Sequence, residues 1–165
     1  MSDDVLAHLR LMALRVGQTA PDFDVNASSG QRLRLSDFRG KKNVVLYFYP
    51  GDFTLVCTRE TCGFRDSYEE LASKDTEVIG VSIDSDESHE RFAKEYKVPF
   101  ALVSDADKSL AQKYSAASML SRITGKTARV TYVIDKKGQV AGVFESELLA
   151  DKHVEGVRDL IQKLR

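Results

Sequence analysis

The stretch NVVLYFYPGDFTLVCTRETC, residues 43–62, contains both cysteines of a 165-residue chain and a change from one secondary-structure pattern to another. Its first seven residues form a continuous apolar run, which is typical of a strand covered on both faces. A proline and a glycine end that run. From about Leu55 to Ser73 the pattern is helical, because Phe64, Tyr68 and Leu71 follow one another at spacings of four and three. The stretch therefore predicts a buried strand that leads into a helix.

The rest of the chain alternates between strand and helix patterns in the same way. Predicted strands and hairpins cover Phe23–Leu35 around the turn NASSG, Glu77–Ile83, residues 100–103, and the pair ARVTYVID and QVAGVFE joined by KKG. Predicted helices lie within DSDESHERFAKEY and DADKSLAQKY, and a closing helix carries Val154, Val157, Leu160, Ile161 and Leu164 on one apolar stripe. This order predicts one α/β domain over residues 1–165, because right-handed crossovers place helices on both faces of a mixed sheet.

Composition narrows the classes of function. The formal net charge of -1 gives no reason to expect nucleic acid or an anionic membrane as a partner. No apolar run approaches the roughly 20 residues that a membrane span needs. Asp3 and Asp4 stand where a signal peptide would carry basic residues, so we expect a cytoplasmic, reducing location. Two cysteines in such a compartment are more often catalytic or metal-binding than structural.

Cys57 is predicted to lie in the first turn of its helix, where reactive sites of open α/β sheets gather. Unpaired backbone N–H groups and the helix dipole both favour a negative charge at this position, so they stabilise a thiolate. The alternative is that Cys57 is a small core residue, since it lies one heptad before Phe64 on the same helix face.

Pro50, Thr54 and Cys57 form the pattern P-x-x-x-T-x-x-C. This pattern resembles the active-site signature of the peroxiredoxins, which are thiol-dependent peroxidases. The run CTRETCGFRD resembles the bacterioferritin-comigratory or Q-type branch, and ARVTYVID resembles the strand that carries the family's active-site arginine, here Arg129. The resemblance runs from about Val16 to the C-terminus and leaves residues 1–15 as an N-terminal extension. It implies a thioredoxin-like fold with an added N-terminal hairpin.

The resemblance also implies a role for each matching residue. Cys57 would be the peroxidatic nucleophile that attacks hydrogen peroxide or an organic hydroperoxide, and Thr54 would donate a hydrogen bond to a peroxide oxygen or to the sulfur. Arg129 would hold the thiolate and the polarised oxygen together. Pro50 would shield the site, and Glu60 would pair with the arginine and orient it.

Each of these residues has a simpler structural alternative. Thr54 suits a helix N-cap and Pro50 suits a strand end, and neither alternative conflicts with a catalytic role. Glu60 would by default be a solvated helix residue, and Arg129 could be a surface residue of an edge strand. However, Arg129 alternates with Thr131 inside an apolar run, which favours a buried cation that needs an anion.

One feature departs from the Q-type pattern. That branch usually has Pro-Gly between its threonine and cysteine, whereas this chain has Leu55 and Val56. The run DFTLVC is closer to the larger, dimeric branch, which keeps its second cysteine near the C-terminus. This chain has no cysteine after Cys62. We expect a monomer or a weak dimer.

Cys62 is the only thiol in the chain that could condense with a Cys57 sulfenic acid. In an intact helix, residues five apart have Cα atoms roughly 8–9 Å from each other, whereas a disulfide needs about 7 Å or less. The pair therefore cannot close without local unwinding. The alternative is that an external thiol resolves Cys57. The resemblance favours resolution by Cys62, with thioredoxin as the reductant.

Neither a metal nor a cofactor is expected. The two cysteines do not have the spacing of a zinc site, and the acids from Asp84 to Glu87 are typical of a helix start. His8, His89 and His153 are scattered, and the sequence assigns them no function.

Two other functions remain open from the residues alone. A thiol–disulfide oxidoreductase of the same fold would usually carry C-x-x-C and a proline before a later strand, whereas here the spacing is C-x-x-x-x-C and Ala128 precedes Arg129. A non-catalytic redox sensor would share the thiol chemistry. Repeated peroxide turnover with a reductant distinguishes an enzyme from a sensor, which reacts once.

Overall fold

A computed structural model of the chain describes residues 14–116, 127–146 and 148–164. The proposed N-terminal extension, residues 1–15, lies almost entirely outside these ranges. The elements follow the order β1 (Asp24–Asn26), β2 (Arg32–Arg34), the 3-10 helix η1 (Leu35–Phe38), β3 (Asn43–Phe48), α2 (Leu55–Ser73), β4 (Thr76–Ser82), α3 (Asp86–Tyr96), β5 (Ala101–Ser104), α4 (Ser109–Lys113), β6 (Val130–Ile134), β7 (Val140–Glu145) and α6 (Ala150–Lys163).

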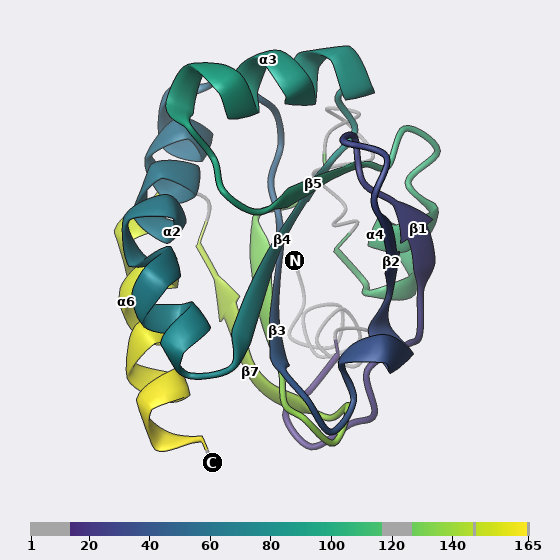
Figure 1. The fold of residues 1–165 in the computed structure, drawn as a ribbon, viewed down its shortest axis with the longest axis vertical. Coiled ribbons are helices and arrows are strands. Elements are labelled where there is room, and N and C mark those ends of the chain that lie inside the picture. Colours follow the sequence, from purple (N-terminus) through teal and green to yellow (C-terminus); the bar gives the residue numbers. More distant parts are fainter. Residues whose placement is uncertain (1–13, 117–126, 147, 165) are drawn as a thin grey trace, which may run out of the picture.

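The main sheet is mixed, as predicted, with the strand order β5-β4-β3-β6-β7. β3 is its central strand: it pairs parallel to β4 and antiparallel to β6. The strands β1 and β2 form the predicted N-terminal hairpin. In Figure 1, α2 and α6 lie side by side on one side of the sheet, and the hairpin and α4 lie on the other. The predicted thioredoxin-like α/β arrangement, with helices on both faces, is confirmed.

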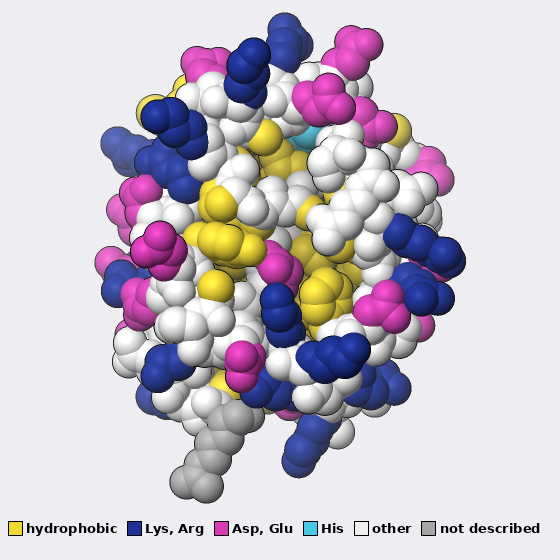
Figure 2. All heavy atoms as spheres, in the orientation of Figure 1, with side chains coloured by type: hydrophobic (Ala, Val, Ile, Leu, Met, Phe, Trp, Pro, Cys, Tyr) yellow, Lys and Arg dark blue, Asp and Glu magenta, His cyan; other side chains and the backbone are white. Residues whose placement is uncertain are grey.

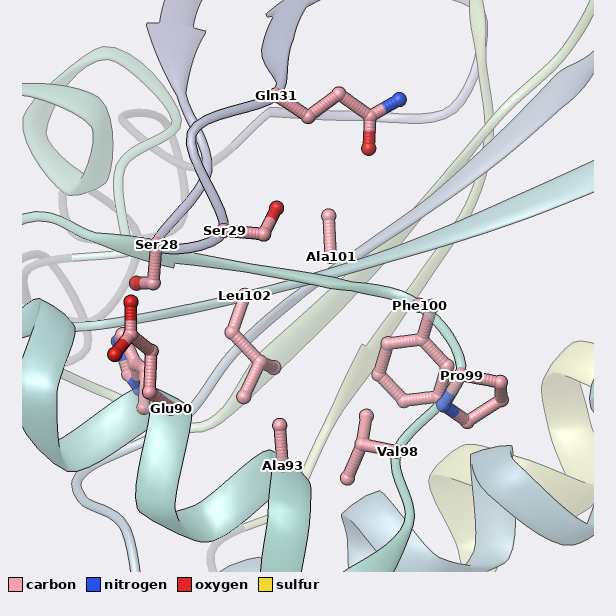
Figure 3. A pocket seen from close by; sticks show the side chains of 11 residues that line it. Ser28, Ser29, Gln31, Glu90, Ala93, Val98, Pro99, Phe100, Ala101 and Leu102 are labelled. Atoms are coloured by element: carbon pink, nitrogen blue, oxygen red, sulfur yellow. The ribbon is translucent and has the colours of Figure 1, made fainter.

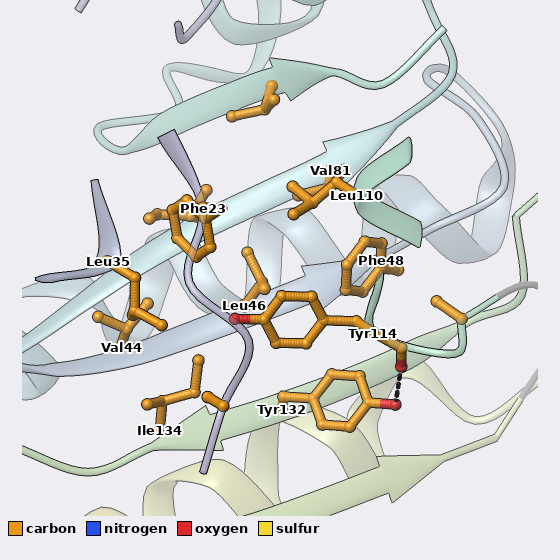
Figure 4. Close-up of a cluster of buried hydrophobic side chains, with 14 of the residues drawn as sticks. Phe23, Leu35, Val44, Leu46, Phe48, Val81, Leu110, Tyr114, Tyr132 and Ile134 are labelled. Atoms are coloured by element: carbon orange, nitrogen blue, oxygen red, sulfur yellow. Dashed lines mark hydrogen bonds between the residues drawn. The ribbon is translucent and has the colours of Figure 1, made fainter. Parts of the chain in front are cut away.

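The side chains of β3 alternate between two buried clusters, as its period of two requires. Val44, Leu46 and Phe48 point toward the hairpin and α4, where Tyr114 and Tyr132 complete the cluster (Figure 4). Val45, Tyr47 and Tyr49 point toward α2, α3 and α6. β3 is buried over its whole length, which explains why its sequence is an unbroken apolar run.

A close approach fixes α2 against α6. A Cβ atom on Gly63 would lie 2.8 Å from Cγ2 of Val154, so the contact depends on the absence of a side chain. Gly63 follows Cys62 directly, and the helix that carries both cysteines is thereby held against the last helix of the chain.

Several predicted boundaries differ from the structure by one to four residues. The strand predicted at Glu77–Ile83 is Thr76–Ser82, and the helix predicted within residues 105–114 spans only Ser109–Lys113. Leu164, predicted on the stripe of the closing helix, follows that helix but still packs on its cluster. No helix in the described parts of the chain is both long enough and apolar enough to cross a membrane.

Candidate active site

Cys57 lies where the prediction places it, in the first turn of α2. Thr54 occupies the N-cap position and Cys57 is the third helical residue, so its sulfur lies near the positive end of the helix dipole. The Cys57 side chain is fully buried. A buried thiol at a helix N-terminus is compatible both with a core residue and with a stabilised thiolate, and its neighbours distinguish the two.

Arg129 is the neighbour that decides between them. Its Nη2 donates to the Sγ atom of Cys57 at 3.0 Å, although the two residues are 72 positions apart. The pairing of β3 with β6 brings them together, because Val130 lies opposite Phe48 at the end of β3. Arg129 is only 4% exposed, so the alternative of a surface arginine is wrong. A buried guanidinium against a thiol is an arrangement that favours thiolate chemistry.

Glu60 completes an ion pair with this arginine. Its Oε1 accepts from Nη1 of Arg129 at 3.0 Å, and its side chain is fully buried, so the alternative of a solvated glutamate is wrong. Glu60 lies three residues after Cys57, on the same face of α2. Burial lowers the pKa of Arg129, but Glu60 and Cys57 outweigh this effect and the net shift is upward. The arginine therefore stays charged between its two partners.

His153 belongs to the same cluster, although the sequence assigns it no function. Its Nε2 donates to the Ser146 carbonyl oxygen at 2.9 Å, so Nδ1 accepts from the Thr131 hydroxyl at 2.8 Å. Nδ1 also lies 3.4 Å from Oε2 of Glu60. Burial and the nearby Arg129 lower the pKa of His153, which keeps the ring neutral. The signal that could have revealed it is a histidine in the apolar stripe of α6, four residues before Val157.

Thr54 and Pro50 lie in the loop between β3 and α2. The Thr54 hydroxyl donates to the carbonyl oxygen of Gly51 at 3.0 Å. Thr54 holds the N-cap position of α2, as its structural alternative predicts, although its side chain makes no capping hydrogen bond to the helix. Pro50 is half-buried directly after the central strand. Thr54 lies three residues and Pro50 seven residues before Cys57 in the chain. The described hydrogen bonds include none from Thr54 to the Cys57 sulfur.

Cys62 lies on the same helix as Cys57 and is half-buried, and both are free thiols. Burial raises the pKa of the Cys62 thiol, and Arg65 offsets part of this rise. α2 is continuous from Leu55 to Ser73, so helix geometry keeps the two Cα atoms roughly 8–9 Å apart. The disulfide that the sequence predicts is absent from this structure and requires a different conformation of α2.

A pocket lies apart from these residues, between α3 and the turn of the hairpin. It encloses about 270 Å³ and is lined by side chains from the turn, α3 and the segment that enters β5 (Figure 3). Figure 2 shows hydrophobic side chains gathered in a hollow on this face, with charged side chains around them. Within the described ranges, no three His, Cys, Asp or Glu side chains gather as a metal site would require.

Comparison with known proteins gives a consistent result. Residues 16–143 match the model of the AhpC/TSA family. The chain is 41% identical over 150 residues to the protein named Peroxiredoxin Q, chloroplastic, of Sedum lineare, which covers 90% of this chain and 78% of that protein. It is 38% identical to Peroxiredoxin Bcp of Bacillus subtilis strain 168, over 90% of this chain and 96% of that protein. The crystal structure of the peroxidoxin BcpB of Mycobacterium tuberculosis superimposes with a TM-score of 0.83 and 31% identity, over 92% of this chain and 99% of that chain.

Proposed function

Because the chain belongs to the AhpC/TSA family and is a thiol-dependent peroxidase of the peroxiredoxin Q type, we propose that Cys57 is the nucleophile that attacks the peroxide. The observation that carries this assignment is the 3.0 Å contact between Nη2 of Arg129 and Sγ of Cys57. The guanidinium stabilises the thiolate, which is the reactive form of a cysteine. Burial raises the pKa of Cys62, and the nearby Arg65 offsets only part of this rise.

The first reaction is a displacement at oxygen. The Cys57 thiolate attacks one oxygen of hydrogen peroxide or an organic hydroperoxide, the S–O bond forms, and the O–O bond breaks. The leaving hydroxide or alkoxide takes up a proton to give water or an alcohol, and Cys57 becomes a sulfenic acid. Negative charge moves from sulfur to the leaving oxygen, so donors that face the peroxide lower the barrier.

The other residues of the site hold and polarise the reactants. Glu60 occupies Nη1 of Arg129 and so turns Nη2 toward the sulfur. The Thr54 hydroxyl, which donates to Gly51 in this structure, turns to donate to the bound peroxide together with the first backbone N–H groups of α2. Pro50 shields the site and offers no N–H group that would compete.

Cys62 resolves the sulfenic acid. Its thiol attacks the Cys57 sulfur, water leaves, and a Cys57–Cys62 disulfide forms. Because both residues lie on one continuous helix, this step requires the first turns of α2 to unwind. A dithiol protein of the thioredoxin type then reduces the disulfide by thiol–disulfide exchange, and α2 folds again.

This cycle requires a compartment that supplies a reductant. The enzyme works in a reducing compartment, and we place it in the cytoplasm, although the plant relatives are named as chloroplastic proteins. We further propose that it is a monomer or a weak dimer. Light scattering on the reduced and the oxidised protein tests this proposal, and a stable higher oligomer would contradict it.

A coupled assay with thioredoxin, thioredoxin reductase and NADPH tests the function. Wild-type protein should consume many equivalents of hydrogen peroxide, and Cys57→Ser should consume none, because a serine hydroxyl is not ionised at neutral pH. Consumption of a single equivalent by wild type would indicate a redox sensor. Reduction of a protein disulfide without peroxide turnover would indicate a thiol–disulfide oxidoreductase, and retained turnover in Cys57→Ser would refute the assignment of the nucleophile.

A further inference from the structure

A second buried polar cluster lies at Asp52, in the loop that carries Pro50 and Thr54. Tyr49 donates its hydroxyl to Oδ1 of Asp52 at 2.7 Å, and Ser88 donates its hydroxyl to Oδ2 at 2.8 Å. Nδ1 of His89 also lies 2.8 Å from Oδ2, and the Asp52 side chain is only 1% exposed. Burial raises the pKa of Asp52, but His89, Tyr49 and Ser88 outweigh this effect and lower it. The group is therefore a buried carboxylate with three converging donors.

His89 has an acceptor on both sides of its ring. Nδ1 faces the Asp52 carboxylate, and Nε2 lies 3.2 Å from the Val103 carbonyl oxygen and 3.4 Å from Oγ of Ser82. The Ser82 hydroxyl donates its own hydrogen to Asp84 at 2.6 Å, so its oxygen accepts from His89. A carboxylate only accepts hydrogen bonds, so Nδ1 of His89 donates to Asp52. The ring therefore links the Asp52 carboxylate to the backbone of β5.

The backbone of the same loop is held in a conformation that it would not adopt alone. The Asp52 N–H donates to Oδ2 of Asp84 at 2.9 Å. Phe53 has a φ of 61°, in the left-handed region that non-glycine residues avoid. Its ring packs edge-on against Phe92 of α3, with 5.2 Å between the ring centroids. Such a conformation persists only when surrounding contacts impose it.

We infer that the buried contact between Asp52 and His89 positions the loop carrying Pro50 and Thr54 for the reaction of Cys57 with peroxide. This inference rests on the proposed function of Cys57. Thr54 is two residues from Asp52, and its hydroxyl is bonded to the Gly51 carbonyl, so a shift of Asp52 moves both. Asp52 and His89 act through these residues and are positioning residues.

The surroundings shield this pair from water. His89 lines the pocket between α3 and the hairpin turn, yet its own side chain is fully buried. Pro99, Phe100 and Leu102 contribute an apolar part of the same wall (Figure 3). A hydrogen bond to a carboxylate is stronger in such a setting than at the surface, so the pair is a stiff link between the loop and α3.

The rate constant for oxidation of reduced Cys57 by hydrogen peroxide, measured by stopped flow, tests the inference. In His89→Gln the amide reaches toward the Val103 carbonyl and leaves Asp52 without its imidazole donor, so we expect a fall of about tenfold to a hundredfold. His89→Asn keeps an N–H donor near the position of Nδ1 and should retain more of the rate. The double variant His89→Gln with Asp52→Asn should be no slower than the slower of these two single variants, because both substitutions break the same contact between Asp52 and His89.

Leu110→Ala is the control for lost stability, because Leu110 is buried in the cluster on the opposite face of the sheet. It should destabilise the protein and leave the rate constant at its wild-type value. Rates of folded His89→Gln and Asp52→Asn within twofold of wild type would overturn the inference, and so would additive losses in the double variant.

Nitrogen-15 NMR of wild-type protein tests the pair without any substitution. Nδ1 of His89 should carry a proton that is hydrogen-bonded to Asp52 and show the shift of a protonated ring nitrogen, and an Nδ1 without a proton would overturn the inference. This readout does not depend on peroxidase activity. Failure of the proposed function would appear instead as a wild-type protein that does not consume peroxide.

Discussion

The two faces of the central sheet are built from the same strand and serve different purposes. Toward the hairpin, Leu46 and Phe48 of β3 pack among apolar side chains, and the hydroxyl of Tyr132 donates to the Tyr114 carbonyl (Figure 4). Toward α2 and α6, the buried side chains include Cys57, Arg129 and Glu60 in direct contact. Both faces bury apolar side chains, and the face toward α2 also buries these charged groups, which must be paired to be tolerated.

This difference between the two faces explains why the domain can stay folded when the first turns of α2 unwind during the proposed reaction. The helix α2 carries the cysteines on the charged face, where its first turns depend on an ion pair and on the close contact of Gly63 with α6. The hairpin face shares the central strands, and none of the residues proposed above for the reaction belongs to its described apolar cluster. We expect α2 to open locally while the strands keep their packing.

The largest effect is expected from Arg129→Ala. It removes the cation beside Cys57, so the thiolate fraction at neutral pH should fall and the rate constant with peroxide should drop by about 10²–10³-fold. Arg129→Lys should recover only part of the rate, because a lysine cannot contact Glu60 and Cys57 in fork geometry. Stopped-flow kinetics and the ultraviolet absorbance of the thiolate measure the two quantities. An unchanged thiolate signal in Arg129→Ala would contradict the electrostatic role.

Cys62→Ser should affect a different step. Its Cys57 should react with the first peroxide at close to the wild-type rate, because Arg129 and Glu60 are untouched. The protein should then stop at the sulfenic acid, lose most recycling by thioredoxin and become over-oxidised at excess peroxide. Mass spectrometry after each addition of peroxide follows these species. Full turnover with thioredoxin would show that an external thiol resolves Cys57.

A variant on the hairpin face sharpens the comparison. Leu46 is fully buried, so Leu46→Ala should lower the free energy of unfolding by about 2–5 kcal/mol. Its rate constant with peroxide should nevertheless match wild type, because the face toward α2 is unchanged. Denaturant unfolding and stopped flow measure the two effects, and this variant is also the stability control for Arg129→Ala. A large loss of rate in Leu46→Ala would contradict the division between the faces.

The smallest expected effect concerns His153 and pH. Its pKa is lowered in the folded state from the usual 6.5, so the unfolded chain binds the proton more readily. Stability should therefore fall as the pH drops below about 6.5, by at most about 1.4 kcal/mol per pH unit from this group. His153→Asn should show a shallower loss between neutral and mildly acid pH in denaturant unfolding. Equal slopes in the two proteins would contradict a buried neutral His153.

Most of the fold could be predicted from local pattern. The apolar run at residues 43–49 and the helical spacing after Leu55 predict β3 and α2 to within a residue. The predicted order of elements also holds for the hairpins and α6. The order β5-β4-β3-β6-β7 was out of reach, because it depends on pairings between strands that are distant in the sequence.

The site residues likewise divide into those with a signal in the sequence and those without one. Spacing and resemblance place Cys57, Thr54, Pro50, Glu60 and Arg129 in one region. In the structure, Arg129 contacts the Cys57 sulfur and Glu60 bonds that arginine. Sequence reasoning missed His153 and the Asp52–His89 pair. Their contacts join elements far apart in the chain, and the local signal is only a histidine on the apolar face of α6 or α3. A buried polar residue has no sequence signature of its own, since its partners come from tertiary structure.

We propose that oxidation joins Cys57 to Cys62 by unwinding α2 while the sheet stays intact. The most direct measurement treats reduced protein with one equivalent of hydrogen peroxide, maps the disulfide by mass spectrometry and follows amide exchange on the same sample. We expect an intramolecular Cys57–Cys62 linkage, loss of protection over residues 55–64, and retained protection in β3 and β4. A Cys57–Cys57 linkage between chains, or the intramolecular linkage with α2 still protected, would contradict it.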